Sequence, residues 1–546
     1  MNIPKLAWTR WIGKGTHRLP AVRQTFDEAA KQVRNRLRRY RADSILLCAL
    51  NRLHEGSRRG GMEDLKSWPW LSLLLAKLVL EEAQIALDRG TPCPPAVFEY
   101  SLQVLWDAQG SRERMDTGDG KLHLMMRSLI QPQLLFQMPP TVDFLRWPAL
   151  IARLPADDPC RALFVERFGL QPELFNLVSY AIHAPVLNNE LRFGPDYFSP
   201  LQETLGDGAE RFLAEFARDA PSLREELQVQ RQDGLAAGQL KRPHHELNEP
   251  PWLMKYPLLR AGNGDLIVWH PAVFARGMNE GVHWRLSERG GEYASQFGRV
   301  FETYVVELLD EAGVKYLSEA EYKKALGSDK NSMEAIVTQG DANVFVEAKL
   351  TVYNSDMAQH THAPVVWKAL KRVRDAMNQG WKVSEQLRQQ GAPNWACTKP
   401  KEDILVIVTS QPAFCATGEH FRRLFKHDVF DPEKLAEREQ KTPSAAQLAT
   451  LPLENIVIAS ITEWEHLMGC VGRGEVDLVQ FLQEAIVANK NPVESVMFID
   501  QLLGGRTKSW PRSKLIETAS NDVELALVHA LGGTAADLED SEEEPN

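Results

Sequence analysis

The sequence predicts a multidomain protein of the α+β or α/β class, with a large N-terminal helical region followed by a mixed-sheet core of element order αβββαβ. The chain has 546 residues, more than a single hydrophobic core usually serves. Residues 1–245 carry apolar side chains mainly at helical spacing. Short apolar runs of strand type begin only after that region. The sheet is therefore expected in the second half of the chain.

Changes in composition divide the chain into five expected segments. Asn263, Gly264 and Asp265 separate two apolar runs, a turn typical of a β-hairpin. Six acidic residues crowd the last ten positions, a composition that cannot bury a core. We expect a mainly helical region of one or two domains at 1–245, a β-hairpin connector at 246–290, the core at 291–475, a C-terminal helical segment at 476–535 and an acidic disordered tail at 536–546.

The first helix is expected to begin at Thr25, because Thr25 and Glu28 have the spacing of a capping box. An apolar stripe of Phe26, Ala30, Val33, Leu37 and Tyr40 follows. Five arginines lie on its other sides: Arg34, Arg36, Arg38, Arg39 and Arg41. The pattern is compatible with a solvated amphipathic helix, but such a density of arginine favours a surface for nucleic acid or an acidic partner.

The core is predicted from alternating helical and strand patterns. Apolar side chains at helical spacing indicate a helix at 297–309, with Glu302 beside its apolar stripe. Strands are expected at 314–317, 332–338, 343–350, 404–409 and 456–461, and a basic helix with Lys368 and Lys371 at 365–388. The turn sequence at 339–342 joins the second and third strands as a hairpin.

Glu347 and Lys349 are the most informative residues of this core. They end an apolar strand and, being two residues apart, point to the same face of it. Burying such charges is costly unless each has a partner or a ligand. The hairpin also brings Glu334 towards Glu347. Two carboxylates and a lysine together suit a hard divalent cation and a group that stabilises charge.

At these residues the chain resembles the PD-(D/E)xK nuclease superfamily, which has the restriction-endonuclease-like fold. The resemblance covers about residues 290–470. It implies that Glu334 is the first motif acid, that Glu347 and Lys349 are the Glu-x-Lys pair, and that Glu302 is the acid of the first core helix.

The chain departs from the family pattern at the first acid. Glu334 stands where Asp is usual, and Met333 precedes it where Pro is usual. A longer carboxylate can still bind magnesium. Asp329 and Asp341 remain alternatives for this ligand.

The resemblance implies a nuclease that uses Mg²⁺ or Mn²⁺, held by Glu334, Glu347 and the Ala348 carbonyl. DNA is favoured over RNA as the substrate, and the architecture is similar to that of endonucleases of bacterial anti-phage defence. One alternative is an RNA-cleaving effector, for example on tRNA. Another is a catalytically silent fold that binds nucleic acid or a partner. Lys368 and Lys371 are either phosphate contacts or solvated, and the N-terminal region is a candidate site for a protein trigger.

Composition points to an ordinary soluble protein. The formal net charge is −10, and six cysteines lie apart without Cys-x-x-Cys spacing, so no zinc site or disulfide framework is indicated. The most apolar run, Leu71–Leu80, is interrupted by Lys77 and is too short to span a bilayer. The first residues lack the apolar segment of a signal peptide. We expect a cytoplasmic protein without membrane contact.

Overall fold

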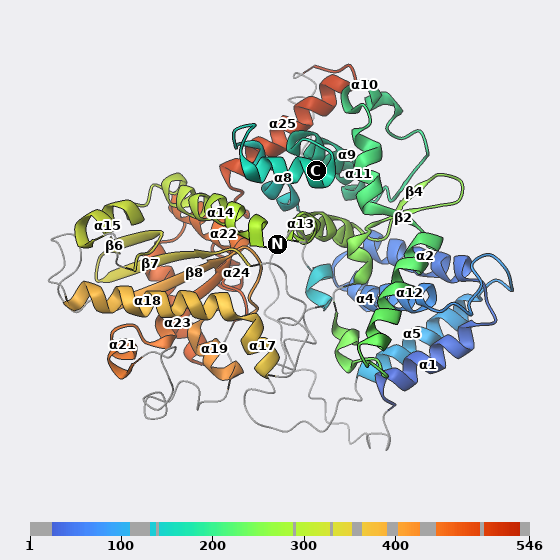
Figure 1. The fold of residues 1–546 in the computed structure, drawn as a ribbon, viewed down its shortest axis with the longest axis horizontal. Helices are drawn as coiled ribbons and strands as arrows, with labels where there is room; N and C mark the ends of the chain where they lie inside the picture. Colours follow the sequence, from blue (N-terminus) through green and yellow to red (C-terminus); the bar gives the residue numbers. More distant parts are fainter. Residues whose placement is uncertain are drawn as a thin grey trace. The chain divides into compact units, whose positions relative to one another are not determined.

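The computed structural model describes residues 24–109, 132–137, 141–249, 251–287, 291–327, 331–351, 363–389, 402–425, 444–491 and 496–534. They divide into two compact units, which are taken separately below (Figure 1). The helical unit contains the described residues of 24–287 and 515–534, and the sheet unit contains those of 291–514. The expected combination of a helical N-terminal region with a mixed α/β part is confirmed. The expected tail at 536–546 lies outside the described residues.

Helices dominate the helical unit. They are α1 (Phe26–Leu37), α2 (Ala42–Arg59), α3 (Gly61–Lys66), α4 (Pro69–Glu81), α5 (Pro95–Gln109), α7 (Arg146–Ala152), α8 (Pro159–Phe168), α9 (Pro172–Leu187), α10 (Gln202–Leu205), α11 (Gly208–Phe216), α12 (Ala220–Ala236), α13 (Pro271–Ser287) and α25 (Lys514–Ala530). None of the helices in the described part of the chain has both the length and the apolar composition needed to cross a membrane.

Helix α1 begins as predicted and ends earlier than predicted. The Thr25 hydroxyl accepts from the Glu28 N–H, and the Glu28 carboxylate accepts from the Thr25 N–H, which completes the capping box. The helix stops at Leu37, because the Tyr40 N–H donates to the Leu37 carbonyl in a tighter turn and the Arg41 N–H donates to Thr91. The prediction that this helix continues to Tyr40 is therefore wrong.

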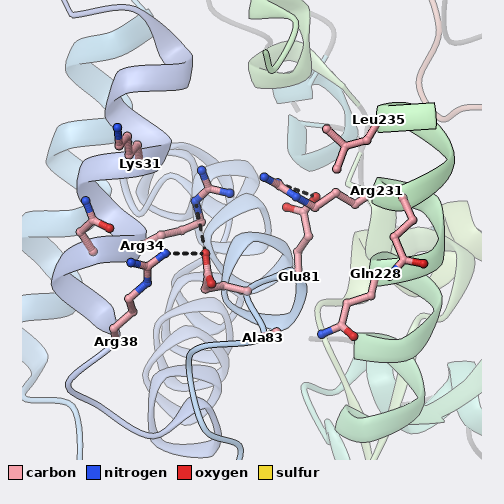
Figure 2. Close-up of a pocket in the computed structure, with 11 residues that line it drawn as sticks. Lys31, Arg34, Arg38, Glu81, Ala83, Gln228, Arg231 and Leu235 are labelled. Carbon is pink, nitrogen blue, oxygen red and sulfur yellow. Dashed lines mark hydrogen bonds and ion pairs between the residues drawn. The ribbon is translucent and has the colours of Figure 1, made fainter. Parts of the chain in front are cut away.

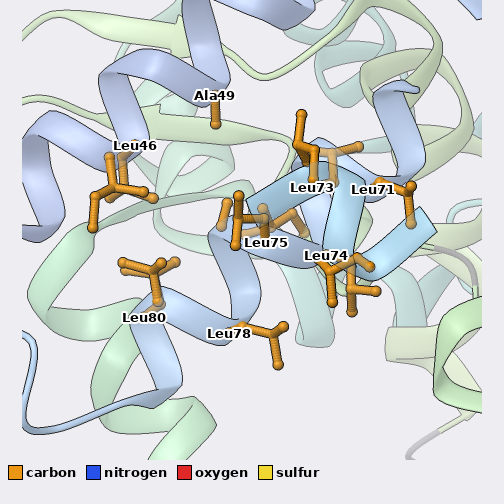
Figure 3. Close-up of a cluster of buried hydrophobic side chains, with 14 of the residues drawn as sticks. Leu46, Ala49, Leu71, Leu73, Leu74, Leu75, Leu78 and Leu80 are labelled. Carbon is orange, nitrogen blue, oxygen red and sulfur yellow. The ribbon is translucent and has the colours of Figure 1, made fainter. Parts of the chain in front are cut away.

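Helix α4 is the centre of the helical unit's core. Its residues from Pro69 to Leu80 are all buried, and leucines of α4 pack with Leu46 and Ala49 of α2 (Figure 3). Lys77 interrupts this apolar run, and its ammonium donates to Glu246 at 3.0 Å. A buried lysine needs such a partner, because an unpaired charge in the core would be costly.

A small mixed sheet completes the helical unit. It has the order β1-β4-β3-β2, from β1 (Arg192–Phe193), β2 (Ala217–Asp219), β3 (Leu258–Arg260) and β4 (Leu266–Val268). Strands β3 and β4 form the hairpin that the Asn263–Asp265 turn predicted. Strands β1 and β2 come from the region expected to be helical, and α13 fills most of the remaining connector. The described residues of the expected connector at 246–290 therefore belong to the helical unit up to residue 287.

The sheet unit is organised around five strands. Its strands are β5 (Leu317–Ser318), β6 (Ala335–Gln339), β7 (Ala342–Lys349), β8 (Glu402–Thr409) and β9 (Ile456–Ser460). Its helices are α14 (Gly291–Glu311), α15 (Glu319–Leu326), α17 (Ala363–Ala369), α18 (Lys371–Gln389), α19 (Gly418–Leu424), α21 (Ala445–Thr450), α22 (Ile461–Gly472), α23 (Leu478–Lys490) and α24 (Asp500–Leu503).

The strands are ordered β5-β6-β7-β8-β9 along the sheet. Strand β6 is antiparallel to both β5 and β7, and β8 and β9 run parallel to β7. Strand β7 is buried along nearly its whole length, as expected for a strand covered on both faces. Helices α14 and α18 both pack on β7 (Figure 1).

Two expected elements differ in detail. The strand expected at 314–317 is reduced to β5, because the Val314 N–H donates back to the Leu309 carbonyl at the end of α14 and cannot join the sheet. The basic helix expected at 365–388 is divided into α17 and α18 at Leu370. Within α18, a Cβ at Gly380 would lie 2.6 Å from the Leu405 side chain. The glycine therefore permits the close packing of α18 on β8.

Candidate functional site

The β6–β7 hairpin brings Glu334 and Glu347 together. Ala335 pairs with Val346, so the next position of the antiparallel register sets Glu334 opposite Glu347. Asp341 lies in the turn at the other end of this hairpin, on the order of 16 Å away along the strands. Asp341 is therefore not part of the same group, and Asp329 lies outside the described residues.

Glu347 is held by a lysine on its own strand and a glutamine from a helix. Glu347 is completely buried, and the Lys349 side chain is 19% exposed. The Lys349 ammonium donates to one carboxylate oxygen of Glu347. The Gln379 amide, on α18, lies 3.3 Å from the other oxygen and 2.6 Å from the Ser332 carbonyl. Gln379 thus ties Glu347 to the segment that leads into β6.

Glu319 is a member of this group that the sequence analysis missed. It is the first residue of α15, directly after the Ser318 cap, and its N–H donates to the Glu334 carbonyl at 3.3 Å. Its carboxylate accepts from Ser332 at 2.5 Å and from Lys323 at 2.6 Å. Only the pairing of β5 with β6 places it here, so the linear sequence carries no clear signal for it.

We call Glu302, Glu319, Glu334 and Glu347 the carboxylate cluster. Burial, followed by repulsion from Glu347, Glu302 and Glu319, raises the pKa of Glu334 to about 8. Burial also raises the pKa of Glu347 to about 7, although Lys349 opposes the shift. Burial and the neighbouring carboxylates therefore favour the protonated forms of Glu334 and Glu347 when no cation is bound.

The two cluster residues that lie on helices, Glu302 and Glu319, differ in the direction of their pKa shifts. Burial raises the pKa of Glu302, on α14, with Lys349 opposing and Glu319 adding to the shift. Burial also acts to raise the pKa of Glu319, but its hydrogen bonds with Lys323 and Ser332 lower it below the ordinary value. Glu319 thus favours its ionised form, whereas burial favours the protonated forms of Glu302, Glu334 and Glu347.

The side chains of this cluster do not form a closed metal cage. Within the part of the chain that the structure describes, no group of three or more His, Cys, Asp or Glu side chains is set to hold a metal ion. One oxygen of Glu347 is already occupied by the Lys349 ammonium. Ala348, whose carbonyl the resemblance assigned to metal binding, is buried on β7 between the two.

The five N-terminal arginines do not form one continuous face. Arg34 and Arg38 both lie against Glu82, at 3.8 and 3.4 Å. Arg36 lies over the Tyr100 ring, 3.9 Å from its centroid. Arg41 follows the end of α1 and pairs with Asp43 at 2.9 Å. Arg39, by contrast, is exposed and makes no ion pair within the described residues.

The two lysines proposed as phosphate contacts are both exposed. Lys368 lies on α17, and Lys371 begins α18. The Lys371 ammonium pairs with Asp375 at 3.4 Å, one turn further along the helix. An exposed pair at this spacing is worth little and leaves the lysine available.

Comparisons with known proteins give no family for this chain. No family model matches it, and neither a curated protein nor a solved structure shows significant similarity to it. The function therefore has to be inferred from the residues of the carboxylate cluster and their surroundings.

Proposed function

We propose that the protein is a metal-dependent nuclease of the PD-(D/E)xK type. The pairing of Glu334 with Glu347 across the hairpin, with Lys349 against Glu347, is the observation that carries this proposal. The surrounding elements support it: α14 precedes three antiparallel strands, and α18 leads from them to the parallel strand β8. This is the order expected for a restriction-endonuclease-like core.

The charge of the cluster fits a divalent cation. Burial, with repulsion from neighbouring carboxylates, raises the pKa values of Glu334 and Glu347, and a cation between them would favour their ionised forms. Glu334, Glu347 and the Ala348 carbonyl would hold Mg²⁺ or Mn²⁺, since these ions prefer oxygen ligands. A bound ion of this kind lowers the pKa of water and neutralises charge on the phosphate.

Other residues of the site would position the metal ligands and stabilise charge on the phosphate. Lys349, at the end of β7, would stabilise negative charge that develops on the phosphate, as a fixed cation does in a partly buried site. Gln379 would keep the Glu347 carboxylate in one orientation through its hydrogen bond. Glu302 and Glu319 each raise the pKa of Glu334 by repulsion, and their negative charge would favour a cation at the cluster.

DNA is the substrate we favour, with cleavage serving bacterial anti-phage defence and a protein trigger acting through the helical unit. An RNA-cleaving effector with the same residues, for example one acting on tRNA, is the alternative within enzymes. A silent fold that only binds nucleic acid or a partner is the second candidate. One observation favours it, because Lys349 already neutralises an oxygen of Glu347.

The test is incubation of the purified chain with plasmid, linear DNA and total RNA, with Mg²⁺ and with a chelator in its place. The proposal expects cleavage that requires Mg²⁺ and is absent from Glu347→Gln protein prepared in the same way. Binding of nucleic acid without any cleavage, indifferent to Glu347→Gln, would favour the silent fold. Cleavage that persists in the chelator would contradict the metal-dependent mechanism.

A further inference from the structure

A cleft in the helical unit lies outside the carboxylate cluster. It has a volume of about 510 Å³ and is bordered by α1, the end of α4 and α12 (Figure 2). Small-molecule sites in proteins typically have volumes of about 300–1,000 Å³. The cleft is therefore large enough for a small organic molecule.

Positive charge is in excess around this cleft. Lys31, Arg34 and Arg38 approach from the α1 side and Arg231 from α12, with Glu81 between them (Figure 2). Four cationic side chains line the cleft against two carboxylates, those of Glu81 and Glu82. Lys31 is exposed and makes no ion pair in the described part of the chain. An anion entering the cleft would meet a net positive lining.

The two carboxylates are already shared between several cations. Glu82 lies against both Arg34 and Arg38. Glu81 pairs with Arg231 at 3.4 Å and also with Arg242, an arginine outside the lining whose side chain is 8% exposed. Each carboxylate therefore serves two guanidinium groups, and positive charge remains unbalanced.

Arg34 is a cation of the lining with a buried donor that has no acceptor among the described residues. Its Nε is buried and has no hydrogen-bond partner among the described residues, since the Glu82 oxygen is 3.8 Å away. Burial, with the nearby charges of Arg242 and Arg231, lowers the pKa of this guanidinium. A buried donor without an acceptor is costly. An anionic ligand would supply negative charge to this crowded group.

The end of α4 does not cancel this positive potential. The carbonyl end of a helix is partly negative and would repel an anion. Arg224 covers it, because its guanidinium donates to the Leu80 carbonyl at 3.1 Å and to the Val79 carbonyl at 3.4 Å. The negative end of the helix is thus neutralised by a residue that does not line the cleft.

The rest of the lining suits the organic part of a ligand. Asn35, Gln228 and Gln232 offer amide groups that donate and accept hydrogen bonds. Leu235 also lines the cleft and is 49% exposed. An exposed leucine next to basic and amide groups can pack against a ring, while the cations bind phosphate.

We propose that this cleft binds a nucleotide-sized molecule that carries phosphate. The cations would bind the phosphate groups, the amides the sugar, and Leu235 the base. A small ligand is favoured over duplex DNA, because the phosphates of a duplex lie on a wide convex surface and the cations here line a cleft. The inference does not depend on the proposed nuclease activity.

Calorimetric titration of the full chain with ADP, inorganic phosphate and a duplex oligonucleotide tests this inference. We expect ADP to bind more tightly than inorganic phosphate. Lys31→Glu and Arg38→Glu should each weaken ADP binding by about tenfold or more, because a charge-assisted contact is lost. Arg39→Glu is the matched control, since it makes the same charge change beside Arg38 but does not line the cleft. Its affinity for ADP should stay near that of the unmodified chain.

Four outcomes would overturn the inference. They are the absence of ADP binding at millimolar concentration, equal affinity for ADP and inorganic phosphate, an Arg39→Glu effect as large as that of Lys31→Glu, and tighter binding of the duplex through Lys31 and Arg38. Lys349→Ala protein provides a separate check. It should bind ADP normally, so that failure of the nuclease proposal and failure of this one remain distinguishable.

Discussion

The Lys349 ammonium donates to the Glu347 carboxylate on the same face of β7, and Glu347 is completely buried. A lysine in this position can stabilise the negative charge that develops on a phosphate, and alanine in its place cannot. Lys349→Ala should therefore lower the rate of Mg²⁺-dependent cleavage by roughly 10²-fold or more. The fold should remain intact, which circular dichroism can verify, because burial favours the protonated form of Glu347 once the Lys349 charge is lost.

Lys382→Ala is the control for this change. Lys382 is an exposed lysine of α18 in the same unit, so its removal changes the net charge equally without touching the cluster. Equal cleavage rates for Lys349→Ala and Lys382→Ala would remove Lys349 from the mechanism.

The position of the first acid is tested by comparing Glu334→Gln with Asp341→Asn. Only Glu334 lies opposite Glu347, and Asp341 is at the far end of the hairpin. Glu334→Gln should abolish cleavage within the limit of detection, and Asp341→Asn should leave it unchanged. The reverse result would show that the hairpin register does not define the site.

Stability without metal should depend on pH through Glu334. Its pKa in the folded protein is about 8 rather than the ordinary 4.5. Above pH 4.5 the unfolded chain ionises this group, whereas the folded chain keeps the proton until about pH 8. Stability is therefore lost as the pH rises through this window and is level above it. In a chelator, Glu334→Gln should raise the melting temperature at about pH 8 and change it little near pH 4.5.

Mg²⁺ should act in the opposite direction, because it favours the ionised carboxylates. Its stabilising effect on the unmodified chain should be larger at about pH 8 than at about pH 6. Thermal unfolding at the two pH values, with and without Mg²⁺, measures both effects. A melting temperature for Glu334→Gln that follows the unmodified chain at every pH would contradict the raised pKa of Glu334 in the folded chain.

Gln379 is predicted to position Glu347 without touching the substrate. Gln379→Ala removes the hydrogen bonds to Glu347 and to the Ser332 carbonyl. We expect a fall in kcat of about tenfold with little change in KM, since an orienting hydrogen bond contributes about 1–2 kcal/mol. Gln386→Ala, on the same helix, removes a hydrogen bond with Tyr322 that does not involve the cluster, and it should cleave normally. A change in KM alone would point to substrate contact.

The sequence predicted the parts of the cluster that depend on local geometry. Glu347 and Lys349 follow from the two-residue period of a strand, and Glu334 follows from the hairpin turn. Glu319 and Gln379 could not be predicted in the same way. Each comes from a helix, and its position depends on how that helix packs against the sheet. No short-range pattern records that packing.

The basic N-terminal segment shows the same limit. The capping box of Thr25 was predictable because it involves only neighbouring residues. The separation of its arginines was not, since Glu82 comes from the end of another helix and binds two of them. The end of α1 at Leu37 likewise depends on a hydrogen bond from Arg41 to the distant Thr91.

Binding of Mn²⁺ to the carboxylate cluster is the most direct test of the central claim. Calorimetric titration of Mn²⁺ into the unmodified chain and into Glu347→Gln protein should be paired with plasmid cleavage by the same samples. We predict that the unmodified chain binds Mn²⁺ and cleaves, and that Glu347→Gln loses both properties while keeping its fold. Unchanged Mn²⁺ binding in Glu347→Gln, or cleavage that survives this substitution, would contradict the account.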